Sequence, residues 1–261
     1  MRLTCFAVLF FATAPIFAHH EAIFGPQSAT MISRQRFVSG QYYLVNEDKA
    51  PDSETRSHIG VLTIGMPLGE EWSVSATFPG ESVRTEGEKT SSGFQDIVFA
   101  ARRSFYLESG ATVLGVATLE PPTIGNLEHR AVGVGGGVLY SQEWTNWSAV
   151  GYALGRTENS LEEGERRGNR LFLGSGVAYE SERLPFSPQV GLSWEKTAQS
   201  QEGGQRIAGS DSSVIFIHPT VMVDVAESAQ MFAAVSLPVA QWSGDEGWQR
   251  WRFATGVIWS F

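Results

Sequence analysis

The chain has 261 residues and a formal net charge of -9, and 18% of its residues are charged while 28 are glycine. The acidic balance argues against a nucleic-acid partner, because a phosphate backbone requires a basic surface. The single cysteine, Cys5, excludes a disulfide framework, and the absence of any run of about 18 apolar residues excludes an ordinary transmembrane helix.

The first residues are typical of a secretory signal peptide. Arg2 supplies a positive start, residues 5–14 form an apolar stretch, and Ala18 ends a small-residue cleavage motif. We therefore expect residues 1–18 to be removed after export and the folded domain to begin after them.

Beyond residue 33 the sequence predicts extended segments and no amphipathic helix. Most are long enough for tilted strands that cross a bilayer, which need about 9–11 residues. The twelve predicted strands span residues 34–45, 56–66, 71–79, 93–106, 111–120, 130–141, 146–156, 168–180, 186–197, 212–225, 229–239 and 248–261.

The connections between these strands alternate between short and long. The short ones are 67–71, 108–110, 142–146, 181–185 and 226–230. The longer polar ones are 46–55, 80–92, 121–129, 157–167, 198–209 and the six-residue 242–247. Outer-membrane barrels show this asymmetry, with short periplasmic turns and longer external loops.

Side chains alternate along the predicted strands with a period of two. In 186–195, Phe186, Val190, Leu192 and Trp194 share one face, and Ser187, Gln189, Gly191, Ser193 and Glu195 share the other. The same pattern puts Trp72, Val74 and Phe78, then Val132, Val134, Val138 and Tyr140, and then Val150, Tyr152 and Leu154 on the bulky face. The opposite faces carry Gly, Ala, Ser and Thr, which do not fill a dry core, so we expect the bulky faces to contact lipid. The first strand, 34–45, has an ambiguous pattern.

Aromatic residues near the strand ends are expected to form the interfacial girdles of a membrane barrel. These are Trp72, Tyr106, Tyr140, Trp144, Trp147, Tyr179, Trp242 and Trp248. Arg103 falls on the lipid-facing side and is expected to reach the periplasmic headgroups beside the turn that follows. Pro188, Pro219 and Pro238 fall inside predicted strands and suggest bulges, because each lacks a backbone donor.

The sequence therefore predicts an all-β protein, a transmembrane antiparallel up-and-down β-barrel of twelve strands in the outer membrane. Residues 34–261 would form the barrel, and residues 19–33 a periplasmic segment that is a candidate short plug. The expected partners are outer-membrane lipid and a small-molecule solute, with no nucleic acid. The oligomeric state is left open.

The last strand alternates hydrophobic residues up to a terminal aromatic, with Trp259 and Phe261 on one face. This resembles the C-terminal assembly signal of Gram-negative outer-membrane proteins, which implies the barrel-assembly machinery as a partner. The start "HHEAIFGPQSA", the stretch "GFQDIVFAARRSFYL" and the twelve-strand pattern resemble the outer-membrane transporter family associated with the MetA pathway of phenol degradation. The resemblance implies passage of small hydrophobic or aromatic molecules and implies no catalytic residues.

A passive channel is the leading functional interpretation. Twelve strands lie between the eight that side chains fill and the sixteen that leave an open pore. Charged residues on the lumen face would then select solutes, or pair with one another in a plugged lumen. The lumen candidates are Asp96, Arg102, Arg170, Glu195, His218, Asp224, Arg250 and Arg252.

Three alternatives stay open. A structural or adhesive barrel with a plugged lumen would bind partners through its acidic external loops. An outer-membrane hydrolase would need a Ser/His or Asp/His set, for which His129 and His218 are the histidines to test, although no serine shows a recognisable signature. Finally, cleavage after Ala18 would expose an α-amine beside His19 and His20, a chelating set for Cu(II) or Ni(II). No motif indicates a cofactor, and we do not expect an enzyme.

Overall fold

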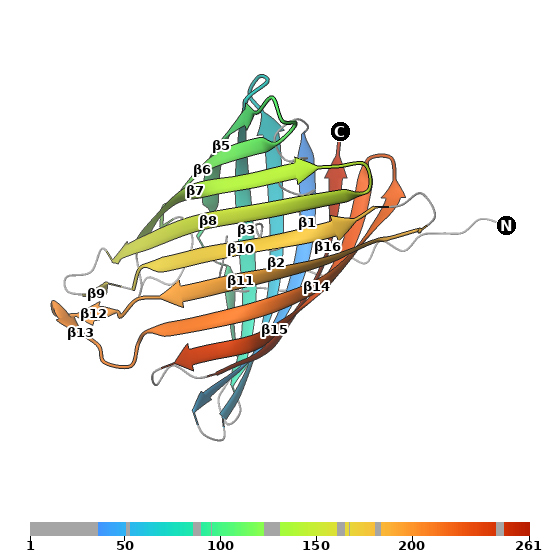
Figure 1. The fold of residues 1–261 in the computed structure, drawn as a ribbon. Coiled ribbons are helices and arrows are strands. Elements are labelled where there is room, and N and C mark those ends of the chain that lie inside the picture. The colour runs from blue at the N-terminus through green and yellow to red at the C-terminus, as the bar shows by residue number, and fades with distance from the viewer. Residues whose placement is uncertain are drawn as a thin grey trace.

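The computed structural model describes residues 36–50, 53–85, 90–94, 96–122, 131–160, 165–166, 168–180, 184–243 and 248–261. Twelve long strands are present: β1 (Phe37–Ala50), β2 (Ser53–Pro67), β3 (Trp72–Thr85), β5 (Val98–Tyr106), β6 (Thr112–Glu120), β7 (Ala131–Glu143), β8 (Trp147–Ser160), β10 (Arg170–Tyr179), β11 (Ser187–Thr197), β14 (Ser212–Ala226), β15 (Ala229–Ser243) and β16 (Trp248–Ser260). Neighbours are antiparallel, and β1 pairs with both β2 and β16, while β2 pairs with β3. The sheet therefore closes into the predicted twelve-stranded barrel (Figure 1). In the part of the chain that the structure describes, no helix is long and apolar enough to cross a membrane.

Four short strands extend one end of the barrel. β4 (Ser91–Phe94) pairs with the distal part of β3, so the single predicted strand 93–106 is divided between β4 and β5. β9 (Glu165–Arg166), β12 (Gln201–Glu202) and β13 (Gln205–Arg206) form a separate small sheet. Its hairpin, β12–β13, projects beyond the barrel wall (Figure 1).

The two ends of the barrel differ as the connections predict. We call the end with the short turns 68–71, 107–111, 144–146, 180–186 and 227–228 the turn rim, and the other end the loop rim. The chain ends at the turn rim, where the N–H of Phe261 donates to the carbonyl of Arg36 at 2.8 Å. The predicted loop 46–55 is wrong, because β1 and β2 continue through most of it as a paired hairpin.

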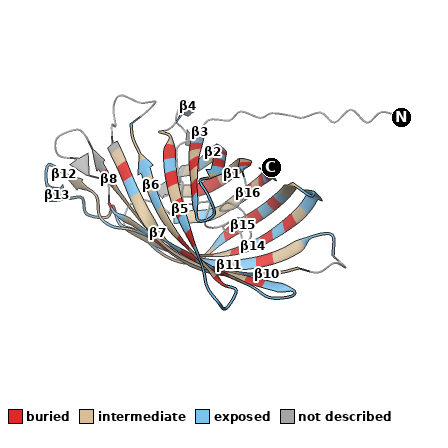
Figure 2. Cartoon of the chain, turned by 90° about the horizontal axis from the view of Figure 1, so that it is seen from above, coloured by how far each residue is buried: buried red, intermediate tan, exposed pale blue. Residues whose placement is uncertain are grey.

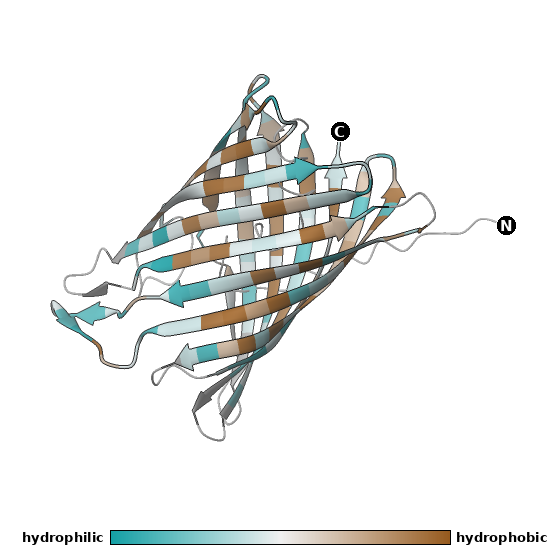
Figure 3. Ribbon diagram, in the orientation of Figure 1, coloured by the Kyte–Doolittle hydropathy of each residue, from teal (hydrophilic) through white to brown (hydrophobic). Residues whose placement is uncertain are grey.

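Burial alternates along the strands and confirms most of the predicted facing (Figure 2). On β11, Val190 and Leu192 are exposed on the outer surface while Gln189 and Ser193 are buried on the inside. Apolar residues are frequent in the middle of the outer wall, and hydrophilic residues gather at the loop rim (Figure 3). Because an exposed apolar belt is stable only in lipid, this is the surface of an outer-membrane barrel.

Strand β8 is an exception, and the sequence prediction for it is wrong. Val150, Tyr152 and Leu154 face the interior, together with the buried Ser148 and Glu158. The register places Tyr152 opposite Gly174 and Leu154 opposite the buried Phe172. The outer face of β8 instead carries the small residues Ala149, Gly151, Ala153 and Gly155.

Glycines on the inner face of β7 leave room for these larger neighbours. A Cβ added at Gly137 would lie 2.1 Å from the carbonyl oxygen of Ala153 and 2.8 Å from Cδ2 of Leu154. A Cβ added at Gly135 would lie 2.4 Å from Oγ1 of Thr118. The glycines of β7 therefore compensate for the bulk of β8 and do not widen the lumen by themselves.

We expect Gly137→Ala to destabilise the barrel by about 1–3 kcal/mol, the usual cost of overpacking. Gly40→Ala is the matched control, because a Cβ there has no atom within 4 Å. The measurement is urea unfolding in lipid vesicles, followed by tryptophan fluorescence. Equal midpoints for the two variants would contradict the described packing.

Aromatic side chains gather at the barrel ends as predicted. Trp72, Tyr106, Tyr140, Trp144 and Trp147 are exposed near the turn rim, and Trp242 and Trp248 near the loop rim. Tyr179 packs against Trp147 with ring centroids 4.8 Å apart.

Arg103 lies on the outer surface at the turn rim. It forms an ion pair with Glu71 at 2.9 Å and lies over the rings of Trp72 and Phe105.

The three prolines in the strands differ in their surroundings. Pro238 adjoins a register shift between β14 and β15, whereas Pro188 and Pro219 pair in a regular register.

Candidate functional site: the barrel lumen

The inner wall formed by β2, β3 and β5 is polar. Hydroxyl groups line it, and Oγ1 of Thr63 lies 3.1 Å from Oγ1 of Thr77. Arg102, a predicted lumen residue, is buried there and donates from Nη1 to Oγ of Ser75 at 2.7 Å. Period-two alternation puts these side chains inside because each neighbour in sequence faces lipid.

A charged cluster lies on the wall between β6 and β10, toward the loop rim. Arg156 pairs through Nη2 with Glu120 and with Glu158, the latter at 3.0 Å. Arg170 is directly opposite Arg156 in the β8–β10 register, and both Arg170 and Asp96 interact electrostatically with Glu120. The alternating signs compensate one another, which buried charges require.

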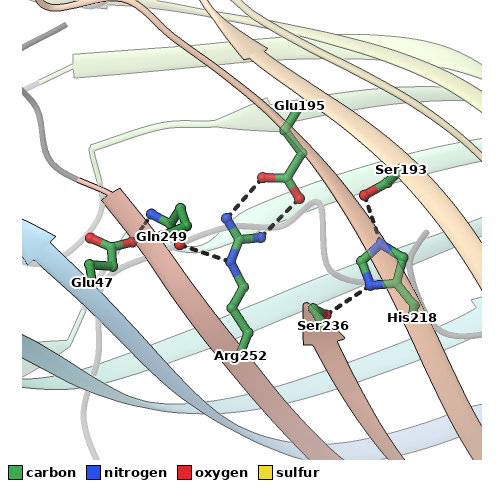
Figure 4. A network of polar contacts seen from close by, with 7 residues as sticks. All are labelled: Glu47, Ser193, Glu195, His218, Ser236, Gln249 and Arg252. Atoms are coloured by element: carbon green, nitrogen blue, oxygen red, sulfur yellow. Dashed lines mark hydrogen bonds and ion pairs between the residues drawn. The ribbon is translucent and has the colours of Figure 1, made fainter. Parts of the chain in front are cut away.

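A second pair joins two strands that are not neighbours. Arg252 on β16 donates from Nη1 and Nη2 to the two carboxylate oxygens of Glu195 on β11, at 2.9 and 3.0 Å (Figure 4). Each side chain is 13% exposed, and the guanidinium lies 4.2 Å above the ring of Phe216. Because β14 and β15 lie between these strands, the pair crosses the inner surface of both.

His218 links the walls on either side of β14. Its Nε2 lies 2.7 Å from Oγ of Ser193, and its Nδ1 lies 2.8 Å from Oγ of Ser236 (Figure 4). A Ser-His-Asp set would have a carboxylate where Ser236 stands. His218 therefore serves as a hydrogen-bonded part of the wall, and its geometry gives the hydrolase alternative no support.

Part of the lumen is apolar, contrary to the prediction that the inner face is small or polar throughout. We call the following group the apolar lumen cluster: Tyr43, Val45, Ile59, Val61, Met222, Phe232, Ala234 and Ala254. It comes from β1, β2, β14, β15 and β16, and so lies across the interior from the charged cluster of β6–β10. The apolar lumen cluster and the charged cluster of β6–β10 therefore lie on different parts of the inner wall.

Two predicted lumen residues lie elsewhere than expected. Asp224 is exposed at the turn rim, where Gln230 donates to it at 2.7 Å. Arg250 is exposed beside a register shift between β1 and β16, which pairs Asn46 with Trp251 and Glu47 with Gln249. The shift makes Arg250 the extra residue of a bulge, so counting alternate residues does not place it.

Several lumen residues were not predicted. Glu158 was assigned to a loop, and Arg156 was not singled out because the facing of β8 was predicted the wrong way round. Gln249 joins Arg252 to Glu47. It was not singled out because it lies between a loop and the bulge at Arg250, where alternation does not define the facing. Ser148, Arg156 and Glu158 are even-numbered and so share one face of β8. Because charged groups avoid lipid, this pattern could have indicated that the face is the inner one.

Of the remaining predicted residues, two lie on the outer surface and the others lie outside the residues that the structure describes. Trp259 and Phe261 are both exposed on the outer surface, and Phe261 is 69% exposed. The signal peptide, the segment 19–33, the His19–His20 pair and His129 lie outside the described residues. Their roles, like the assembly role of the C-terminal aromatic residues, stay predictions.

Comparison with known proteins supports the fold. No protein-family model and no curated protein matches the sequence. Among solved structures, the COG4313 outer membrane channel from Pseudomonas putida F1 matches with a TM-score of 0.73 and 14% identity, over 87% of this chain and 96% of that one. The NanC porin matches with a TM-score of 0.55 and 12% identity, over 87% and 100%. The beta domain of the Bordetella autotransporter BrkA matches with a TM-score of 0.58 and 12% identity, over 87% and 100%. At these identities the likeness shows the outer-membrane barrel fold alone.

Proposed function

We propose that the barrel is a passive channel for small solutes that carry an apolar or aromatic part. The observation that carries the proposal is an inner wall that holds both polar groups and an apolar cluster, since a water-filled passage needs the polar groups and an apolar solute benefits from the cluster. All described residues belong to the wall, its turns or the short strands at the loop rim. The likeness to the solved structures of an outer membrane channel and of the NanC porin favours the same function.

This proposal includes the finer parts of the sequence interpretation. Membership of the transporter family associated with the MetA pathway of phenol degradation would fit the twelve-stranded architecture. The C-terminal Trp259 and Phe261 would be read by the barrel-assembly machinery before the last strand pairs with β1. Several lumen side chains, such as Phe216 and Thr63, are fully buried. A passage lined by such closely packed side chains would be narrow and would suit small molecules.

Planar-bilayer conductance of the refolded protein tests the proposal. The wild-type protein should give discrete current steps. Thr118→Trp should reduce them strongly, because Thr118 faces the interior beside Gly135. Leu119→Trp is the matched control, because Leu119 is the next residue and is exposed on the outer surface. Absence of current steps from correctly inserted wild-type protein would favour the plugged, structural barrel instead.

A further inference from the structure

Arg252 is held in place by contacts on three sides. Glu195 accepts two hydrogen bonds from its Nη atoms, Phe216 supports the plane of the guanidinium, and Oε1 of Gln249 accepts from Nε at 3.3 Å. Gln249 is itself fixed, because its N–H donates to Oε1 of Gln241 at 3.1 Å and its side chain donates to Glu47. Phe216 and Gln249 would still orient Arg252 if Glu195 moved away.

The apolar lumen cluster begins beside this guanidinium. Val45 is directly opposite Arg252 in the β1–β16 register, and Tyr43 is opposite Ala254. Val45, Tyr43 and Ala254 all belong to the cluster. A rigid cation with two parallel donors therefore adjoins an apolar cluster, and both lie on the inner face of the wall.

We propose that Arg252 and the apolar lumen cluster bind small monocarboxylates with an apolar or aromatic body, and that the ligand's carboxylate replaces Glu195 on Arg252. A guanidinium fork matches a carboxylate in two parallel hydrogen bonds, so the exchange preserves the geometry of Arg252. The released Glu195 is then solvated by lumen water, and the body of the ligand covers the cluster. This inference rests on the proposed function and names the solute class for it.

Ligand-observed saturation-transfer NMR on the detergent-solubilised full chain tests the inference. The probes are benzoate, benzyl alcohol and benzylammonium, which share a ring and differ in charge. Benzoate should bind at least about tenfold more tightly than the other two, because only benzoate offers a carboxylate to Arg252. The loss of one charge-assisted hydrogen bond raises Kd by about this factor. Equal binding of all three probes would overturn the inference.

Two variants should change benzoate binding in opposite directions. Arg252→Gln should weaken it about tenfold or more by removing the fork, whereas Glu195→Gln should strengthen it by removing the competing carboxylate. A purely structural ion pair would make both variants weaken binding or leave it unchanged, and either result overturns the inference. Arg56→Gln is the control, because Arg56 is exposed and pairs with Glu54.

A third variant decides the question if Glu195→Gln does not fold. Arg252→Lys keeps the positive charge and loses the fork and its stacking on Phe216, so benzoate binding should fall several-fold. Unchanged binding in Arg252→Lys would overturn the inference. The binding assay needs no ion current, so a barrel without conductance that binds benzoate in this manner would contradict the proposed channel and leave the ligand site established.

Discussion

Leu192→Arg should destabilise the barrel by about 2–4 kcal/mol, the cost of an arginine on the lipid face near the bilayer midplane. Leu192 lies in the middle of β11, is exposed on the outer surface and has the buried Ser193 as its neighbour. The charge would have to leave water without a charged partner, because the nearest outer side chains Val190, Trp194 and Ser175 carry no carboxylate. Urea unfolding in vesicles and heat-modifiable migration on gels measure the effect.

Gln41→Arg is the control for this prediction. Gln41 is partly buried on the inner face of β1, where it donates to Oγ of Ser39 at 3.0 Å. A new charge there contacts polar groups and lumen water, so we expect a much smaller change. Equal destabilisation by the two substitutions would show that the inner and outer faces have the same environment.

Arg156→Met should destabilise the barrel by about 3–5 kcal/mol, the cost of removing one partner from a buried ion pair. Arg156 is shared by Glu120 and Glu158, and all three side chains are at most 19% exposed. Its loss leaves two carboxylates close together with no cation between them. The free energy of unfolding in vesicles is the quantity to measure.

Removing the carboxylates as well should restore most of the stability. The triple variant Arg156→Met, Glu120→Gln, Glu158→Gln leaves Arg170 and Asp96, which carry opposite charges, so we expect an unfolding free energy close to that of the wild type. If the triple variant is no more stable than Arg156→Met, the three residues do not act as one charge-compensating cluster.

The architecture was predictable from the sequence because lipid on one side imposes a strong period of two. On β11 the outer residues Val190, Leu192 and Trp194 are bulky and apolar, and each inner residue is small or polar, so strand and facing follow from alternation alone. The aromatic residues at the strand ends and the unequal connections gave two further, independent indications of a membrane barrel.

The facing of β8 was not predictable from residue size, because its inner residues are the larger ones. Its inner side chains Val150, Tyr152 and Leu154 fill space left by the glycines of β7 and β10, a compensation between strands that no single strand reveals. Only the polar ends of the strand, from Ser148 to Glu158, indicate the correct side.

The sequence indicates which residues face the lumen but does not indicate which of them contact one another. Glu195 and Arg252 could be placed inside from their parity, but their pairing across β14 and β15 depends on the curvature of the sheet and the register of four strands. The apolar lumen cluster was missed because β1 and β2 are apolar on both faces, so Tyr43 and Ile59 give no contrast with their neighbours. Arg250 was misplaced because a bulge interrupts the period there.

Nitroxide scanning of residues 189–193 on β11 tests most directly whether the wall separates lipid from an enclosed lumen. Spin labels on introduced cysteines are practical because the natural sequence has one cysteine, Cys5, in the predicted signal peptide. In vesicles, labels at Val190 and Leu192 should collide often with oxygen dissolved in the bilayer, and labels at Gln189, Gly191 and Ser193 should not. Reversed alternation, or equal access of a water-soluble nickel chelate to all five positions, would contradict the account.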